Sequence, residues 1–388
     1  MESGGVQTGA LPVHDAALDG LRAVAAGLVV LTHAAFLSGA VNSAGLVGHL
    51  MGRGDFGVAI FFALSGYLLH RGFLRAPACR ATLPGYYLRR AARVLPAYWL
   101  VLLVVALTAH PSTRDLVLHA LGLQIYARGS HLPSFSQAWS IATELSFYAV
   151  LPLIAAALAR LRTRRPDAPL GMLTLTLPLA VLVTGLVPAT DVDTGIPAER
   201  WLPARAASFL VGMILAEAVA RPDHPVSTRL RSWTRPAGPI LVVGAAAYLF
   251  ATTPVAGLLT LGVVDGWRLA AKMALSCVVA GALLLPLVLG GANGYARALA
   301  HPAMAWLGRV SYGTFLWHVP VFTGMYAVSG VQYFSGGLLP LLALGVPITL
   351  ALATLSYHLV ELPLMRWAAR RRGRARPAPA AHTAAPRG

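Results

Sequence analysis

The sequence predicts an all-α fold, a polytopic membrane bundle of about ten transmembrane helices with both termini in the cytoplasm. The first observation is composition: 57% of the 388 residues are hydrophobic and 12% are charged, whereas a soluble domain is usually about a quarter charged. The second is that apolar runs near the ~20 residues needed to cross a bilayer recur along the whole chain. The third is that Arg residues concentrate in every second connection between these runs.

Ten apolar runs, bounded by charged residues or by Pro and Gly, mark the expected spans. The third and the seventh are the weakest, and residues 116–127 are expected to form a short or re-entrant helix. We expect a cytoplasmic N-terminal segment at 1–17, a membrane domain at 18–363 and a disordered basic cytoplasmic tail at 364–388. The ten spans are 18–38, 55–74, 94–110, 138–159, 170–189, 203–220, 237–254, 268–290, 304–328 and 337–360.

The basic residues set the expected orientation. Segments predicted to face the cytoplasm carry about three times as many Arg and Lys residues as those predicted to lie outside, which agrees with the positive-inside rule. The net charge of +17 is therefore assigned to topology and to contact with anionic membrane lipid. We expect no nucleic-acid partner, because the basic residues are not interleaved with aromatic ones. The expected location is a cell membrane, which the chain crosses many times.

Ionisable residues within the first span are the first functional signal. His33 follows Arg22 by eleven positions, which is roughly 20° past three full turns, so both side chains lie on one helix face about 16 Å apart along the axis. Asp19 lies close to the same face, one turn before Arg22. One interpretation is structural, with a local Asp19–Arg22 ion pair and a packed core histidine. The other is functional, because ionisable groups inside a bilayer are costly and usually mark a site.

Later spans add polar groups at positions expected inside the bilayer. Glu144 lies in the first two turns of the fourth span, where a carboxylate must be paired, protonated or in contact with water. The ninth span carries His318 beside Trp317, with Tyr312 earlier. Ordinary helix packing explains each of these aromatic residues taken alone. Ser65 in the second span is equally explained by close helix packing.

A cluster of arginines marks the expected cytoplasmic mouth of the bundle. Arg90 and Arg93 lie one turn apart at the start of the third span, next to Arg89. Part of this charge serves topology, but guanidinium groups also bind phosphate through paired hydrogen bonds. A His and a Glu deeper in the membrane suit removal of a proton from a hydroxyl. The pattern therefore indicates acyl transfer from an acyl-CoA to an alcohol. The two cysteines, Cys79 and Cys277, have no metal-ligand spacing.

Six segments of the chain resemble, in order, motifs of the membrane acyltransferase type 3 family, the O-antigen acetyltransferase-like integral membrane proteins. One such segment would be weak, but the six run across the ten expected spans. A chain of this length without a fused extracytoplasmic domain resembles the macrolide-sugar O-acyltransferases of actinomycetes, and the Arg- and Ala-rich composition agrees with an actinobacterial origin. The segments are LDGLRAVAAGLVVLTH at 18–33, GVAIFFALSGYLL at 57–69, RRAARVLPAYW at 89–99, WSIATELSFY at 139–148, LGRVSYGTFLWH at 307–318 and YHLVELP at 357–363.

The resemblance implies a ten-helix bundle that transfers an acyl group from a CoA thioester on the cytoplasmic side to a hydroxyl, usually of a sugar. Acetyl-CoA or a short branched acyl-CoA is the implied donor, and we expect no permanently bound cofactor and no metal. The resemblance further implies that Arg22 and His33 are the essential pair of the family. It places Arg90 and Arg93 near the donor, and it matches Glu144 to a family glutamate.

These signals combine into one mechanistic hypothesis with one rival. His33 is expected to act as general base on the acceptor hydroxyl, and Glu144 to orient an imidazole or hold the acceptor. The rival mechanism passes through an acyl-His33 intermediate. The residues expected to bind the donor are Arg22, Arg90 and Arg93, and those expected to bind substrate are Asp19, Ser65, Trp139, Tyr312, Trp317 and His318.

The expected acceptor is a sugar hydroxyl of a small glycosylated metabolite, such as a macrolide-type antibiotic. The alternative acceptor is a surface polysaccharide, peptidoglycan or a lipid-linked sugar. A protein of another class, a proton-coupled transporter that uses the His as a proton relay, stays open as well. Against a transporter, the chain shows no internal inverted repeat. The sequence predicts no oligomeric state.

Overall fold

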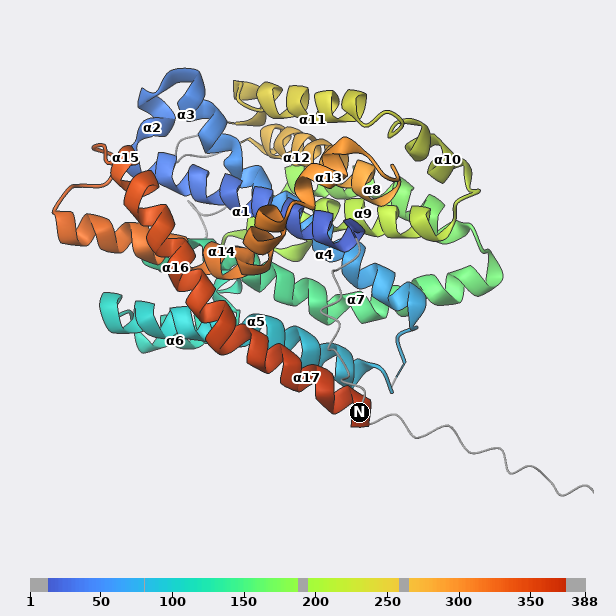
Figure 1. Cartoon of the computed structure of the whole chain (residues 1–388), viewed down its shortest axis with the longest axis horizontal. Coiled ribbons are helices and arrows are strands. Elements are labelled where there is room, and N and C mark those ends of the chain that lie inside the picture. The colour runs from blue at the N-terminus through green and yellow to red at the C-terminus, as the bar shows by residue number, and fades with distance from the viewer. Residues whose placement is uncertain (1–12, 80, 188–194, 258–264, 375–388) are drawn as a thin grey trace, which may run out of the picture.

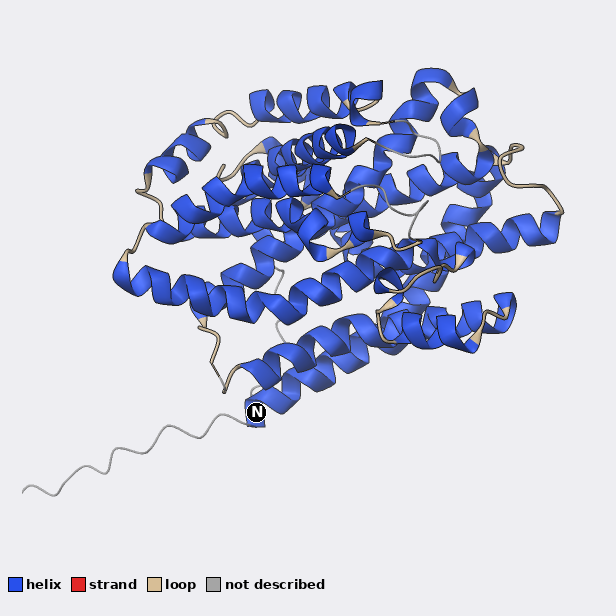
Figure 2. Cartoon of the chain, turned by 180° about the vertical axis from the view of Figure 1, so that it is seen from behind, coloured by secondary structure: helices blue, strands red, loops and turns tan. Residues whose placement is uncertain are grey.

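The computed structural model describes residues 13–79, 81–187, 195–257 and 265–374, and within these ranges it contains helices and loops but no strand (Figure 2). Figure 1 shows the long helices lying side by side in one bundle. The α-helices are α1 (Val13–Ser38), α2 (Ala40–Ser43), α3 (Gly45–Gly52), α4 (Phe56–Arg75), α5 (Leu83–Ala109), α6 (Thr113–Ala120), α7 (Trp139–Arg164), α8 (Ala168–Leu186), α9 (Leu202–Ala220), α10 (Pro225–Ser232), α11 (Gly238–Phe250), α12 (Gly266–Val288), α13 (Gly294–Leu299), α14 (Pro302–Ser329), α15 (Leu338–Pro340), α16 (Val346–Ser356) and α17 (Leu362–Arg374). The short 3₁₀ segments are η1 (Arg53–Asp55), η2 (Gln124–Tyr126), η3 (Pro133–Ala138), η4 (Ala198–Arg200) and η5 (Pro254–Ala256), and the π-helical segments are η6 (Leu341–Gly345) and η7 (Tyr357–Glu361).

Each of the ten expected spans overlaps a helix, and the polytopic membrane bundle is confirmed. Eight helical stretches of the described residues are long and apolar enough to cross a membrane. The ninth expected span corresponds to α14, which is 28 residues long and carries several polar side chains. The seventh corresponds to α11, which has only 13 residues, in line with its weak apolar signal. The orientation of the termini stays a prediction.

The third span is longer than the sequence indicated, because α5 begins at Leu83 and not near residue 94. Pro84 is tolerated in the first turn, where a backbone N–H has no helical partner in any case. Arg90 and Arg93 resembled a break between spans, yet the helix continues through them because their side chains reach a cleft at its end. The short helix expected at 116–127 is present as α6 followed by η2.

The helices extend further toward both ends of the chain than expected. α1 begins at Val13, inside the segment assigned to a cytoplasmic N-terminal extension. α17 continues to Arg374, although the segment from 364 to 388 was expected to be disordered. The reason is that Met365 and Ala368 lie one turn apart and face α5 together, and Ala368 is buried. Figure 1 shows α17 lying along α5. Residues 1–12 and 375–388 lie outside the described residues.

Glycines let the central helices approach one another closely. A β-carbon at Gly212 of α9 would overlap the backbone of α4 at Ala63. A β-carbon at Gly308 of α14 would likewise overlap the backbone of α1 at Asp19. Small residues of this kind are the usual means by which helices pack in a membrane. The α4–α9 and α1–α14 pairs therefore form the centre of the bundle, and α14 is held directly against the helix that carries His33.

A buried cluster of charges, which the sequence did not predict, joins three helices near one end of the bundle. Glu217 of α9 is 0% exposed and accepts hydrogen bonds from Arg162 of α7, at 2.5 Å, and from His70 of α4, at 2.8 Å. Arg221 lies 3.8 Å from the second carboxylate oxygen. A buried carboxylate is stable only when it is paired and hydrogen-bonded. The cluster therefore fixes α4, α7 and α9 relative to one another.

Candidate active site

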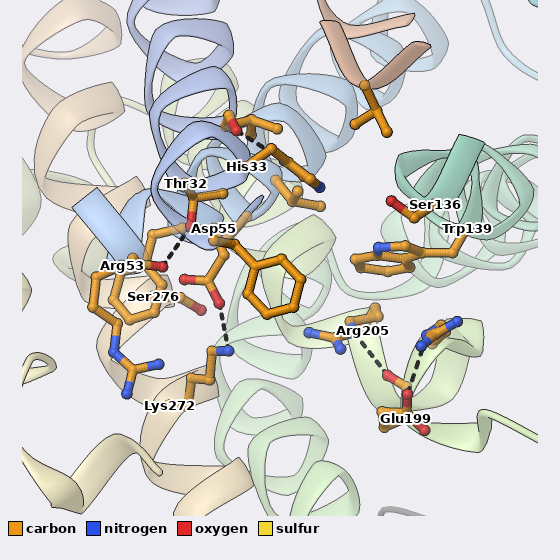
Figure 3. Close-up of a pocket in the computed structure, with 18 of the residues that line it drawn as sticks. Thr32, His33, Arg53, Asp55, Ser136, Trp139, Glu199, Arg205, Lys272 and Ser276 are labelled. Carbon is orange, nitrogen blue, oxygen red and sulfur yellow. Dashed lines mark hydrogen bonds and ion pairs between the residues drawn. The ribbon is translucent and has the colours of Figure 1, made fainter. Parts of the chain in front are cut away.

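A cavity of about 660 Å³ lies at the end of the bundle that the Arg distribution predicts to face away from the cytoplasm. Its walls come from the second half of α1, η1, the starts of α4, α7, α9 and α12, and η4. Figure 3 shows His33, Trp139 and Arg205 around this space. Small-molecule sites usually measure about 300–1,000 Å³, so this outer cavity has the size of a ligand site.

His33 faces the outer cavity and is supported from behind by a second histidine. Its Nδ1 atom lies 2.9 Å from the carbonyl oxygen of Val29 and 3.2 Å from Nε2 of His318. The two rings meet edge to face, with centroids 4.8 Å apart. His318 is completely buried, and its own Nδ1 lies 3.2 Å from the carbonyl oxygen of Thr314.

These contacts determine which ring nitrogens carry the protons. A carbonyl oxygen only accepts hydrogen bonds, so Nδ1 of His318 must donate to Thr314 and its Nε2 is left as an acceptor. Nδ1 of His33 then donates to Val29 and to His318. The remaining nitrogen of His33, Nε2, carries a free electron pair. Because this side chain lines the outer cavity, a proton acceptor or nucleophile is available there.

Charged side chains from four elements line the same cavity. Lys272 of α12 forms an ion pair with Asp55 of η1. Arg200 and Glu199 of η4 form a second pair, with 3.2 Å between Nε and Oε1. From the sequence, these cations were expected only to set topology and to contact anionic membrane lipid. The structure shows that Arg200 and Lys272, from distant parts of the chain, meet in one cavity.

Arg205, on the second turn of α9, is held in place by two contacts. Its Nε donates to the carbonyl oxygen of Glu199 at 2.7 Å. Its guanidinium carbon lies 4.9 Å from the centre of the Trp139 ring, which is a cation–π geometry. Both side chains line the outer cavity. The guanidinium is therefore fixed in orientation before any ligand binds.

A second, smaller cavity of about 90 Å³ lies deeper in the bundle, toward the predicted cytoplasmic side. Glu144 of α7 is its central acid and accepts hydrogen bonds from Ser65 at 2.5 Å and from Tyr148 at 2.6 Å. Tyr312 also lines this inner cavity and donates to the carbonyl oxygen of Val94 at 2.8 Å. The sequence predicted that Glu144 orients an imidazole or holds the acceptor; its hydrogen-bond partners are hydroxyl groups, and its role toward a substrate stays a prediction.

An arginine-lined cleft of about 400 Å³ adjoins the inner cavity at the predicted cytoplasmic end. The two share Arg22, Arg90 and Arg93. Arg22 forms the ion pair with Asp19 that the sequence suggested. The inner and outer cavities in turn share Val58 and Phe62 of α4. Cleft, inner cavity and outer cavity therefore lie next to one another along the bundle.

The residues predicted from the sequence thus fall into two separate groups. The outer group is His33 and Trp139, with His318 behind His33. The inner group holds the arginines with Glu144. Trp317 is 7% exposed and lines none of these three spaces. Their roles toward a substrate stay predictions. The inner group is Asp19, Arg22, Ser65, Arg90, Arg93, Glu144 and Tyr312.

Comparison with known proteins gives one family. The model of a family described as an acyltransferase domain matches residues 15–358. The exopolysaccharide production protein ExoZ of Rhizobium meliloti is 29% identical over 357 residues, which cover 86% of this chain and 95% of that protein. The putative peptidoglycan O-acetyltransferase YrhL of Bacillus subtilis is 26% identical over 89% of this chain, and peptidoglycan O-acetyltransferase OatA of Listeria monocytogenes is 25% identical over 90%. The aligned part is 54% of YrhL and 55% of OatA. No solved structure gives a significant match.

Proposed function

This chain belongs to the acyltransferase family whose model spans residues 15–358, and from that premise we propose that it moves an acyl group from acyl-CoA to a sugar hydroxyl. The donor enters at the arginine-lined cleft, and the acceptor occupies the outer cavity. One observation carries the proposal above the others. His33 presents an unprotonated Nε2 to a cavity of ligand size at the end of a series of cavities that begins at Arg22, Arg90 and Arg93.

The inner end has the chemistry to hold the donor. Arg22, Arg90 and Arg93 present guanidinium groups suited to the phosphates of CoA. Arg22 lies on the same face of α1 as His33, roughly 16 Å away along the axis. A long, thin pantetheine arm extended from this cleft would carry its thioester through the inner cavity toward Val58 and Phe62.

The outer end has the chemistry to activate the acceptor. The acceptor hydroxyl attacks the thioester carbonyl, a C–O bond forms and the C–S bond breaks. Nε2 of His33 takes the hydroxyl proton and returns it to the departing thiolate, so CoA leaves as the thiol. The imidazolium formed in between is stabilised by its Nδ1–H bonds to Val29 and His318. In the rival route Nε2 attacks the thioester carbonyl, the C–S bond breaks and CoA departs as the thiolate. The acceptor hydroxyl then takes the acyl group from acyl-His33, and its proton passes to the thiolate, so CoA again ends as the thiol.

The names of the relatives favour a glycan as acceptor. One relative is an exopolysaccharide production protein and two are named as O-acetyltransferases of peptidoglycan. A surface polysaccharide, peptidoglycan or lipid-linked sugar is therefore the first candidate. The sugar of a small glycosylated metabolite, such as a macrolide-type antibiotic, is the second candidate. Its support is the Arg- and Ala-rich composition, which resembles that of actinomycete proteins.

Mass spectrometry of the host's surface glycans and secreted metabolites tests both candidates. Wild-type cells are compared with cells that carry His33→Ala. Loss of one acyl mass from a surface glycan supports the first candidate, and loss from a secreted glycoside supports the second. His358→Ala is the control, because this histidine is exposed and lines none of the three spaces. If no ester is lost while the mutant protein is present in the membrane, the transferase proposal fails and a transport assay follows.

A further inference from the structure

We propose that the outer cavity selects an acceptor that carries an oxyanion, either a carboxylate or a phosphate ester, and that Arg205 binds this group. The inference rests on the proposed function and names its acceptor class. It starts from the charges of the cavity wall. Asp55 is paired with Lys272, and Glu199 is paired with Arg200. These four charges cancel, so they give the cavity no preference for either sign of ligand.

Two further cations, Arg53 and Arg205, line the cavity without a carboxylate partner among the described residues. They differ in how many of their N–H donors are already used by the protein. Arg53 is 1% exposed, and its Nε and Nη2 atoms donate to the carbonyl oxygens of Ala251 and Gly257. It therefore anchors the segment that follows α11. Within the described part of the chain, the hydrogen bond of Arg205 comes from Nε and goes to the Glu199 carbonyl oxygen. The positive charge offered to a ligand is therefore that of Arg205.

The orientation of Arg205 suits two-point binding of an oxyanion. The ring of Trp139 supports one face of the guanidinium, and the Glu199 carbonyl fixes its inner edge. Both terminal amino groups are left without a partner in the described part of the chain. A guanidinium held in this way loses little side-chain entropy when it forms two parallel bonds to a carboxylate or phosphate. Burying an unpaired cation inside a membrane bundle costs free energy. An anion bound to Arg205 offsets this cost.

The anion belongs to the acceptor and not to the donor. Arg205 and His33 line the same cavity, so an oxyanion on Arg205 is part of the molecule whose hydroxyl meets Nε2. The guanidinium groups suited to CoA phosphates lie in the cleft on the far side of the inner cavity. That inner cavity measures about 90 Å³, which is too small to pass a nucleotide. The acceptor is therefore an acidic sugar or a sugar held through a phosphate ester.

Equilibrium binding to the full chain in lipid nanodiscs tests the inference without any acyl donor. The probes are two matched pairs: phenyl β-glucuronide against phenyl β-glucoside, and glucose 1-phosphate against glucose. We expect one anionic probe to bind about 10- to 100-fold more tightly than its neutral counterpart, the range for hydrogen bonds to a charged group. The carboxylate pair and the phosphate pair then identify which oxyanion is preferred. The preference should weaken as salt is added.

Three variants assign the preference to Arg205. In Arg205→Gln it should disappear, and in Arg205→Lys it should survive in part, because the charge stays but the paired geometry is lost. Arg268→Gln is the matched control: Arg268 lies over Trp267 with 5.1 Å between the guanidinium carbon and the ring centre, but neither residue lines the cavity. Thermal melting in the nanodisc verifies that each variant is folded.

The inference is overturned if the wild-type protein binds each anionic probe no better than its neutral counterpart, or binds none of the four. It is also overturned if the preference survives in Arg205→Gln. Failure of the proposed function looks different. If the protein prefers the anionic probes through Arg205 but transfers no acyl group, the anion site is supported and the proposed transferase function is wrong.

Discussion

The outer and inner cavities use polar groups in opposite ways. Among the described residues, His33 keeps one ring nitrogen without a partner in the outer cavity, and Arg205 keeps two amino groups without one. In the inner cavity both Ser65 and Tyr148 donate to one oxygen of Glu144. The outer cavity thus offers unused hydrogen-bonding capacity to a ligand, whereas one oxygen of the inner carboxylate is already engaged by two hydroxyl groups of the protein. This difference supports the proposal that the acceptor reacts on the outer side and that the inner side positions the donor.

Replacing His33 is expected to have the largest effect and to act on one cavity only. Loss of Nε2 in His33→Ala should lower acyl transfer by about 10²- to 10⁴-fold, the usual contribution of a general base. Binding of CoA should be unchanged, because the arginine-lined cleft stays intact. Single-turnover transfer from labelled acetyl-CoA, together with CoA binding, measures both. If CoA binding falls in parallel with transfer, the division between the two cavities is wrong.

Replacing Arg90 should weaken donor binding and leave the outer cavity unchanged, which is the reverse of the result expected for His33. Arg90 lines both the cleft and the inner cavity, so Arg90→Gln should weaken acetyl-CoA binding by about 10- to 100-fold through loss of a charge-assisted hydrogen bond. Binding of sugar probes in the outer cavity should stay at the wild-type level. Arg75→Gln is the control for general loss of cytoplasmic charge, because Arg75 is exposed and lies outside the cleft. Equal losses in both variants would mean that Arg90 acts only as a topology charge.

The boundary between the cavities can be tested at Phe62. This side chain lines both cavities and stacks on Phe209, with ring centroids 4.3 Å apart. Phe62→Trp should obstruct the passage and lower transfer by about 10-fold or more, since small misplacements of reactants are costly. Donor and acceptor binding, measured separately, should change little. Phe209→Trp is the control, because it overpacks the same stack at a residue that lines neither cavity. If transfer falls as far in this variant as in Phe62→Trp, the cause is general strain and not an obstructed passage.

The smallest effect is expected behind the outer cavity, at His318. His318→Phe keeps a ring in place but removes the acceptor for Nδ1–H of His33, which still has the Val29 carbonyl. Loss of one hydrogen bond of about 0.5–1.5 kcal/mol should lower transfer by roughly 2- to 10-fold. Transfer rates of His318→Phe and His318→Gln separate packing from hydrogen bonding, because Gln can restore an acceptor. If His318→Phe is as inactive as His33→Ala, then His318 takes part in the chemistry directly.

Several features of the site could be predicted from the sequence because they depend on one helix. The alignment of Arg22 with His33 follows from helical periodicity, and the Asp19–Arg22 ion pair follows from their spacing. The short length of α11, 13 residues, agrees with the weak apolar signal of this segment in the sequence. The start of α5 was misplaced because arginines inside a helix resemble a connection between spans. Only the cleft that receives their side chains shows otherwise.

Other features depended on contacts between helices and had no local signal. His318 and His33 are 285 positions apart, and nothing in either segment indicates that their rings meet. Asp55, Arg205 and Lys272 resembled ordinary charges at the outer ends of spans. Glu144 was expected to orient an imidazole or hold the acceptor, and its hydrogen-bond partners in the structure are Ser65 and Tyr148.

The sequence by itself determined the membrane bundle, the family and the stripe of polar residues on α1, because hydrophobic length, motif order and helical periodicity are properties of consecutive residues. The tertiary structure alone decided which nitrogen of His33 faces the outer cavity without a partner, and which guanidinium there keeps its terminal amino groups unbonded, among the described residues. Both depend on partners supplied by other helices, such as His318 for His33 and Trp139 for Arg205. Those partners are selected by helix packing at glycines such as Gly308, which no single segment can specify.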